Sequence, residues 1–334
     1  MKKILNTTYK TLISMTYINI IEDMPHQIRE AIKLAQGIKV EGEIDNILVT
    51  GMGGSGIPAD LIKTIMHEEK TPVIVNKDYS IPAFTNNKTL VFVISYSGNT
   101  EETLAAYKEA AKRRAKIVCI CSGGKLKQIA TDAKLIIVPE GMPPRSAIAY
   151  LLFPALIVLH NSKLIKLNRE TLVRTIDALH APELKQKAQD LAEQLFEKTP
   201  LIYASPAFEA VALRWKQAIN ENSKQHAFWN VFPEMNHNEM MAYTRQQQGF
   251  HAILLRDEND NQRLQKRINL TKDIIKKQGT TTTEIMLKGE TLLVKIMTAI
   301  FLGDLTSYYL GIKNKVNPEE TKLIEEFKIK LSRN

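Results

Sequence analysis

Short apolar runs alternate with helix-length amphipathic stretches along most of this chain, and this rhythm constrains its fold more than any other feature. Short runs rich in β-branched side chains are typical of strands buried on both faces. In the first half they occupy residues 47–50, 72–75, 90–95, 117–121 and 135–138. The lengths between them suit crossover helices, so the sequence predicts an α/β fold: a doubly wound, Rossmann-like parallel sheet flanked by helices.

The rhythm repeats more weakly in the second half, and 334 residues leave room for about two domains. The expected strands there are 201–204, 252–255 and 284–287, and the expected helices are 208–220 and 261–277. An apolar helix at 146–160 follows Pro143-Pro144, and helices at 292–310 and 320–331 close the chain. We therefore expect an N-terminal extension (1–23), a first domain (24–162), a helical connection (163–198) and a second α/β domain with the C-terminal helices (199–334).

Two polar loops follow predicted strands of the first domain. The first satisfies the G-x-G-x-x-G spacing of dinucleotide sites, with Asp78 about where a ribose-binding acid is expected: Gly51-Met52-Gly53-Gly54-Ser55-Gly56. The second opens a helix at Glu101 and combines hydroxyls, amides and a helix N-terminus: Ser95-Tyr96-Ser97-Gly98-Asn99-Thr100. That combination suits a phosphate dianion without a metal.

A dinucleotide fold does not require the second loop, so the pair favours a phosphorylated ligand over a nicotinamide cofactor. Both loops also have purely structural explanations. Any tight strand-to-helix turn uses glycine, and Asn99 and Glu102 have the spacing of a capping box, which would satisfy the first amides of the helix.

Composition argues against several other classes of protein. Lys and Arg exceed Asp and Glu by 45 − 36 = 9, which favours anionic partners, but the basic residues are dispersed without a nucleic-acid motif. Cys119 and Cys121 lie in one predicted strand, and the histidines lack metal-ligand spacing. No apolar stretch approaches the roughly 18–20 residues of a membrane span. We expect a soluble cytoplasmic protein with no metal, no cofactor, no nucleic-acid partner and no membrane association.

The two loops resemble those of the sugar isomerase (SIS) domain. Over residues 24–331 the order of further motifs resembles the bifunctional phosphoglucose/phosphomannose isomerases: Pro144-Arg145, Asn220-Glu221-Asn222, Pro233-Glu234 and His237-Asn238. This resemblance implies two SIS subdomains per chain and a cytoplasmic homodimer. It also implies a phosphate site built from Gly54, Ser55, Ser95, Ser97 and Thr100.

Aldose–ketose isomerisation passes through a cis-enediolate, so it needs a ring-opening acid/base, a carboxylate and a positive charge. By resemblance, Glu221 is the general base, Arg145 stabilises the enediolate, and Thr321 and Lys328 contact substrate, with Lys330 as the alternative to Lys328. His237 shuttles the ring proton; the family often has two adjacent histidines, whereas this chain has Asn236 before it. A helix-end glutamate, a capping histidine and a surface arginine are the corresponding structural explanations.

The sequence therefore predicts an isomerase that interconverts glucose 6-phosphate, and also mannose 6-phosphate, with fructose 6-phosphate without metal or nucleotide. One alternative is a regulatory SIS module that binds a sugar phosphate without turnover; such a sensor needs the serine loops but not Glu221 or His237. Another is a nicotinamide-dependent enzyme using residues 51–56. The resemblance favours a homodimer with shared active sites, in which His237 acts in the partner's site rather than in its own.

Overall fold

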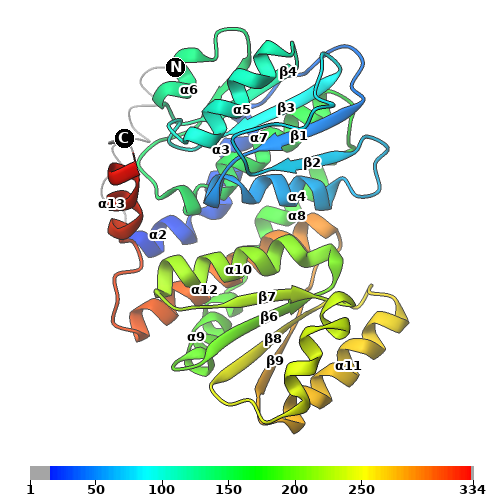
Figure 1. The fold of residues 1–334 in the computed structure, drawn as a ribbon, viewed down its shortest axis with the longest axis vertical. Coiled ribbons are helices and arrows are strands. Elements are labelled where there is room, and N and C mark those ends of the chain that lie inside the picture. Colours follow the sequence, from blue (N-terminus) through cyan, green and yellow to red (C-terminus); the bar gives the residue numbers. More distant parts are fainter. Residues whose placement is uncertain (1–15, 332–334) are drawn as a thin grey trace. The chain divides into compact units, whose positions relative to one another are not determined.

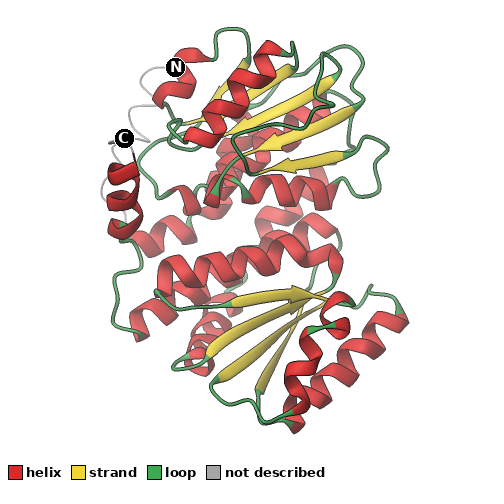
Figure 2. Ribbon diagram, viewed as in Figure 1, coloured by secondary structure: helices red, strands yellow, loops and turns green. Residues whose placement is uncertain are grey.

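The computed structural model describes residues 16–331, which divide into two compact units (Figure 1). Within the described residues, the first unit comprises 16–180 and Gly289–Val294, and the second comprises Ala181–Lys288 and 295–331. Of the expected N-terminal extension, residues 1–15 lie outside the described part, and Tyr17–Glu22 form helix α2. Each unit contains one parallel sheet with helices packed on it, as the apolar runs predict (Figure 2).

The sheet of the first unit has the strand order β2-β1-β3-β4-β5, and every neighbouring pair is parallel. The predicted strands are confirmed with small shifts at their ends: β1 Asn46–Thr50, β2 Val73–Asn76, β3 Thr89–Ile94, β4 Lys116–Cys121 and β5 Lys134–Ile137. The helices are α2, α3 Met24–Leu34, α4 Ile57–Ile65, α5 Glu101–Lys112, α6 Gly124–Ile129, α7 Ile148–Asn161 and α8 Arg169–Ala178.

Continuous apolar composition makes this sheet a buried layer. All six residues of β3 are buried, and their side chains point alternately to the two faces. On one face Val91 and Val93 pack in a cluster with Ala106 and Tyr107 of α5 and Leu126 of α6. Helices α3, α4 and α7 pack together as a further layer of the unit, and α7 is buried along nearly its whole length. A sheet covered on both faces explains why its strands show no polar alternation.

The second unit repeats the plan with a smaller parallel sheet in the order β7-β6-β8-β9. The strands are β6 Thr199–Ala204, β7 Phe228–Val231, β8 Phe250–Arg256 and β9 Thr281–Met286. The helices are α9 Glu183–Leu195, α10 Glu209–Ser223, α11 Gln262–Lys277, α12 Leu292–Lys313 and α13 Lys322–Leu331. Strand β7 is not among the predicted strands, because it is a four-residue edge strand held by pairing with β6 and has no alternating pattern of its own.

Helix α12 is long and apolar enough to cross a membrane, which the sequence analysis did not anticipate. However, 78% of its most apolar window is buried. Two buried ion pairs also hold it within the second unit, Lys295 with Asp257 at 2.6 Å and Asp304 with Arg214 at 2.7 Å. Its Gly303 lies against the Trp215 ring of α10, where an added Cβ would come within 2.4 Å of Nε1. These contacts identify α12 as a core helix.

His251 of β8 makes the stability of the second unit depend on pH. The residue is 3% exposed, and its ring nitrogens lie 2.8 Å from Thr283 Oγ1 and 2.9 Å from Thr281 Oγ1. Burial, with a smaller effect from Lys198, lowers the pKa of His251 to about 4. The His251 ring binds a proton near pH 6.5 in the unfolded chain but only near pH 4 in the folded chain. The free energy of unfolding is therefore unaffected by His251 above pH 6.5 and falls as the pH drops toward 4.

We predict that acidification from pH 7 to 4.5 removes about 2–3 kcal/mol from the free energy of unfolding through His251 alone. Urea unfolding followed by tryptophan fluorescence measures this loss, since Trp215 and Trp229 both lie in the second unit. His251→Gln should lose correspondingly less on acidification, while His226→Gln, at an exposed histidine, should match wild type. Equal losses in all three proteins would contradict the assignment.

Candidate active site

The two predicted phosphate loops meet at the carboxyl edge of the first sheet. In a sheet of this strand order the winding reverses between β1 and β3, and ligands bind in the crevice there. The loops leave these two strands, as can be followed in Figure 1. The backbone N–H of Tyr96 donates to Ser55 Oγ at 3.0 Å, and Ser95 Oγ donates to Thr100 Oγ1 at 3.0 Å. The structure thus brings Ser55, Ser95 and Thr100 together.

The second loop is fixed by close backbone contact with the loop that follows β4. Gly98 has a φ of +67°, and a Cβ there would lie 1.9 Å from Gly123 O, so only glycine fits. The loop ends at Thr100, the N-cap residue of α5, whose first amides carry the partial positive charge of a helix N-terminus. Ser97 is exposed beside them, with its Oγ 3.3 Å from the N–H of Asn99.

The expected capping box at Asn99 and Glu102 does not form. Helix α5 begins one residue later, so Thr100 occupies the N-cap. The Asn99 side chain instead donates to Ser97 O at 3.1 Å and accepts from Lys125 N at 3.0 Å. Asn99 therefore ties the phosphate loop to α6, and the first amides of α5 are left for a ligand.

Arg145 lies directly against the first loop. It sits in a short 3-10 turn, Pro144–Ser146, and a Cβ at Gly54 would come within 2.7 Å of Arg145 Cα, so Gly54 permits this approach. The arginine is 2% exposed. Its Nε donates to Tyr17 Oη at 3.0 Å, and its Cζ lies 5.1 Å from the centre of the Tyr17 ring. Sequence reasoning missed Tyr17, because it carries no motif and falls within the expected extension.

Glu221 occupies the last turn of α10 in the second unit and is half-buried. The helix end is held firmly: buried Asn222 donates to Ser307 Oγ at 2.8 Å. Lys224, in the left-handed conformation, donates through Nζ to the backbone oxygens of Glu221 at 2.5 Å and Glu320 at 2.8 Å. This shared ammonium places the residues just before α13 next to the end of α10.

Thr321, one of the predicted substrate contacts, therefore lies close to the Glu221 backbone. Its Oγ1 donates to Glu325 Oε1 at 2.8 Å. Lys328 and Lys330 lie further along α13, where every residue from 322 to 331 is exposed. Because both lysine side chains are exposed, burial does not distinguish them, and Lys328 as the residue that contacts substrate stays a prediction.

His237 is exposed in a 3-10 turn, Glu234–His237, that follows the carboxyl end of β7. The turn is anchored by Phe232 and Met235, both fully buried in the core of the second unit. Glu221 lies at the other end of this sheet, because α10 runs back from the end of β6 to the start of β7. A helix of 15 residues spans about 22 Å, so one chain holds Glu221 and His237 far apart.

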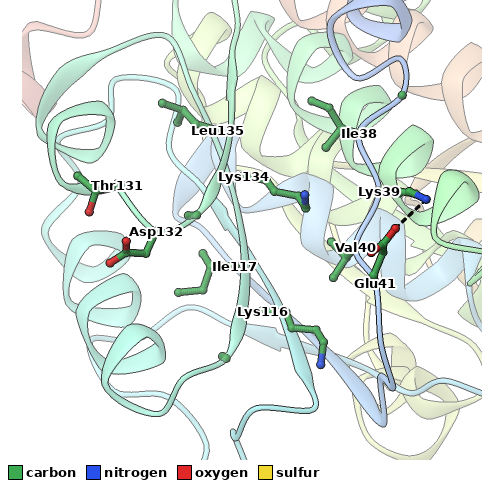
Figure 3. A pocket seen from close by; sticks show the side chains of 13 residues that line it. Ile38, Lys39, Val40, Glu41, Lys116, Ile117, Thr131, Asp132, Lys134 and Leu135 are labelled. Atoms are coloured by element: carbon green, nitrogen blue, oxygen red, sulfur yellow. Dashed lines mark ion pairs between the residues drawn. The ribbon is translucent and has the colours of Figure 1, made fainter.

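A pocket of about 930 Å³ lies at the amino edge of the first sheet, the edge away from the phosphate loops. Figure 3 shows the side chains that line it. Lys116 and Lys134, which begin β4 and β5, line it. Lys116 Nζ donates to the backbone oxygens of Glu43 and Asn87, and Lys39 pairs with Glu41 at 2.7 Å. Lys116 and Lys39 thus already have partners within the protein, and the pocket contains none of the predicted site residues.

No group of three or more His, Cys, Asp and Glu side chains that could hold a metal ion occurs within residues 16–331. The two cysteines are buried in β4 and unpaired, as their strand position predicts. Burial raises the pKa of Cys119 to about 12, with a further contribution from Cys121. A thiol with so high a pKa is a weak nucleophile at neutral pH.

Comparison with known proteins assigns both units to the same domain class. Residues 43–160 match the SIS domain family, and residues 184–331 match the bacterial phospho-glucose isomerase C-terminal SIS domain. The fold is similar to a hypothetical protein from Thermus thermophilus, with a TM-score of 0.78 at 15% identity over 99% of this chain and 94% of that one. The fold and the phosphate loops thus define a tandem SIS-domain protein.

Whole-chain similarity narrows the class further. The chain is 37% identical over 331 residues to the bifunctional phosphoglucose/phosphomannose isomerase of Caldicellulosiruptor bescii, covering 93% of this chain and 98% of the relative. It is also 36% identical over 206 residues to a D-glucosamine-6-phosphate 4-epimerase of Sulfolobus acidocaldarius, covering 61% of this chain and 65% of the relative. The chain belongs to the bifunctional phosphoglucose/phosphomannose isomerase family.

We predict that Ser97→Ala/Thr100→Ala lowers kcat/KM for a sugar phosphate by roughly a hundredfold or more, since each hydroxyl lost to a phosphate dianion is worth about 1.5–3 kcal/mol. Steady-state kinetics measures this fall. Thr103→Val is the matched control, because it removes a buried hydroxyl one turn further along α5. Unchanged kinetics in the double variant would place the phosphate elsewhere.

Proposed function

We propose that this protein interconverts glucose 6-phosphate and mannose 6-phosphate with fructose 6-phosphate. The observation that carries the proposal is whole-chain membership of the isomerase family. The joined loops that we propose as a phosphate cradle support it, as does the presence of Glu221 and His237, which a sensor would not need. Both aldoses lose the C2 proton to give the same enediol, so a site that tolerates either C2 configuration serves both.

The proposed reaction needs only side chains of this protein. The phosphate binds at Ser55, Ser95, Ser97 and Thr100, which fixes one end of the sugar. His237 moves the proton that opens the ring, and Glu221 carries a proton between C2 and C1. Arg145 offsets the negative charge that develops on the enediolate. Because one of C1 and C2 is oxidised while the other is reduced, the reaction has no need of a nucleotide or redox cofactor. Because Arg145 supplies the positive charge for the enediolate, the proposed mechanism also uses no metal.

Arg145 is suited to this role by its fixed position. The Tyr17 hydroxyl accepts a hydrogen bond from Arg145 Nε, and the Tyr17 ring lies under the guanidinium. Gly54 packs against the main chain of Arg145. A charge held in place before the reaction costs little reorganisation when the enediolate forms. Thr321 and Lys328 contact the sugar hydroxyls in this proposal.

We further propose a homodimer in which each site takes Glu221 from one chain and His237 from its partner. The separation of these residues at opposite ends of one sheet supports this arrangement, because a hexose phosphate is too short to touch both. Phe228 of the edge strand β7 is 53% exposed and offers an aromatic contact for a second copy. Phe232, in contrast, is fully buried in its own unit and cannot serve as an interface anchor.

The first prediction from this proposal is activity on fructose 6-phosphate without added cofactor. Separate coupling assays should detect both aldose phosphates, and exhaustive treatment with EDTA should leave the rate unchanged. The similarity to a D-glucosamine-6-phosphate 4-epimerase makes glucosamine 6-phosphate the comparison substrate. Binding of fructose 6-phosphate without either product would favour a sensor, and turnover of the amino sugar alone would favour the epimerase reaction.

Glu221→Gln should lower kcat by at least about a hundredfold, because the amide keeps the shape of the side chain but cannot accept the carbon-bound proton. Affinity for the enediolate mimic 5-phosphoarabinonate, measured by calorimetry, should persist. Glu209→Gln, at the exposed first turn of the same helix, is the matched control and should behave as wild type. Loss of mimic binding together with turnover would make Glu221 a structural residue.

Mixing two inactive variants tests the shared site. Equal amounts of Glu221→Gln and His237→Ala chains, unfolded and reassociated, should regain about a quarter of wild-type activity. Half of the dimers are then mixed, and each mixed dimer has one intact site of two. If each chain builds its own site, the mixture will stay at the residual rates of its parents.

A further inference from the structure

The segment that carries His237 is held on both sides of the histidine by side-chain hydrogen bonds. Before it, Asn236 Nδ2 donates to Thr271 Oγ1 of α11 at 2.8 Å. After it, Asn238 Oδ1 accepts from the N–H of Glu239 at 2.6 Å. The imidazole itself is exposed, so its location is set by this backbone rather than by packing around the ring.

Glu239 provides the strongest of these anchors. Its Oε1 accepts from Tyr203 Oη at 2.5 Å, and its Oε2 accepts from Asn230 Nδ2 at 2.6 Å. Tyr203 belongs to β6 and Asn230 to β7, so one carboxylate spans two adjacent strands near their carboxyl ends. Hydrogen bonds to a carboxylate are shorter and stronger than neutral ones, and both of these are short.

The donor and the acceptor in each of these hydrogen bonds can be assigned. A carboxylate can only accept, so Tyr203 donates its proton to Glu239 and its oxygen must accept from Tyr243, 2.9 Å away. Asn230 Oδ1 already accepts from Val231 N at 2.8 Å, which fixes its amide with the NH₂ toward Glu239. Tyr203 is 1% exposed, and burial raises its pKa, so it remains a donor across the working pH range.

We propose that Glu239 is a positioning residue for the isomerase reaction: by bridging Tyr203 and Asn230 it fixes the turn that presents His237. The inference rests on the proposed function, in which His237 moves the ring-opening proton. A misplacement of about 1 Å in an acid/base group can cost a hundredfold in rate. Glu239 therefore acts on kcat through His237.

Exchanging the two partners tests the bridge. Glu239→Gln leaves one acceptor oxygen for two donors: its NH₂ faces either the NH₂ of Asn230 or the hydroxyl of Tyr203 that now donates to it. It should lower kcat for fructose 6-phosphate about tenfold to a hundredfold, with KM within about threefold. Adding Asn230→Asp restores the bond with donor and acceptor interchanged and should return most of kcat. Tyr203→Phe should resemble Glu239→Gln, whereas Tyr243→Phe, which leaves both donors to Glu239 in place, should resemble wild type. No rescue by the exchange would overturn the proposal.

A double-mutant cycle tests whether Glu239 positions His237 or only stabilises the fold. If Glu239 acts only through His237, Glu239→Gln should not lower further the residual kcat of His237→Ala. Equal fold-losses in both backgrounds would make Glu239 a structural residue and overturn the inference.

A nuclear magnetic resonance measurement on His237 tests the bridge without relying on enzyme activity. The His237 imidazole resonance, identified by its absence in His237→Ala, should shift or broaden in Glu239→Gln and return in the exchanged pair. If it does so in a protein without isomerase activity, the proposed function fails while the structural bridge stands. An unchanged resonance in Glu239→Gln would overturn the bridge, whatever the activity.

Discussion

The parallel pairing of β1 with β3 is the constraint on which the candidate site depends. Their register sets Thr50 beside Val93, so the two strands end at nearly the same level and deliver both loops to one place. The strand order reverses there, which leaves the crevice uncovered by a crossover helix. The hydrogen bond across the crevice, from the N–H of Tyr96 to Ser55 Oγ, depends on that common level. A shift of one residue in register would separate these two groups.

Most of the fold could be predicted because its buried strands are recognisable from the apolar pattern of their own residues. The central strands β1, β3 and β4 of the first sheet are buried on both faces, so each is a nearly continuous apolar run. The glycines and serines of the two loops directly follow β1 and β3. Strand β7 escaped prediction because a short edge strand depends on its neighbour β6 rather than on its own pattern. The apolar character of α12 was also underestimated, because buried Lys295 and Asp304 interrupt its apolar run.

Residues of the candidate site could be predicted where the proposed reaction requires a particular residue type within a motif. Residues that join the site only through a contact made in the folded chain could not. Arg145 and the serine loops stand in motifs, but Tyr17 is distant in sequence and is recognised only from its contact with Arg145. The spacing of Asn99 to Glu102 predicts a cap, yet the Asn99 amide instead donates to Ser97 O of its own loop and accepts from Lys125 N of α6. Glu239 lies two residues from His237, and only the fold shows that it bridges two strands.

The contact of Gly98 with the backbone of Gly123 has a consequence for the energetics of substrate capture. Two loops joined this closely, and tied again by Asn99 to Lys125, have already given up their conformational entropy when the chain folds. In the proposed site, a phosphate group that binds between these loops therefore does not have to order the loop that receives it. Its binding free energy remains available to hold the sugar while the ring opens and the proton moves, which is how a distant, unreactive group can contribute to the rate of the reaction.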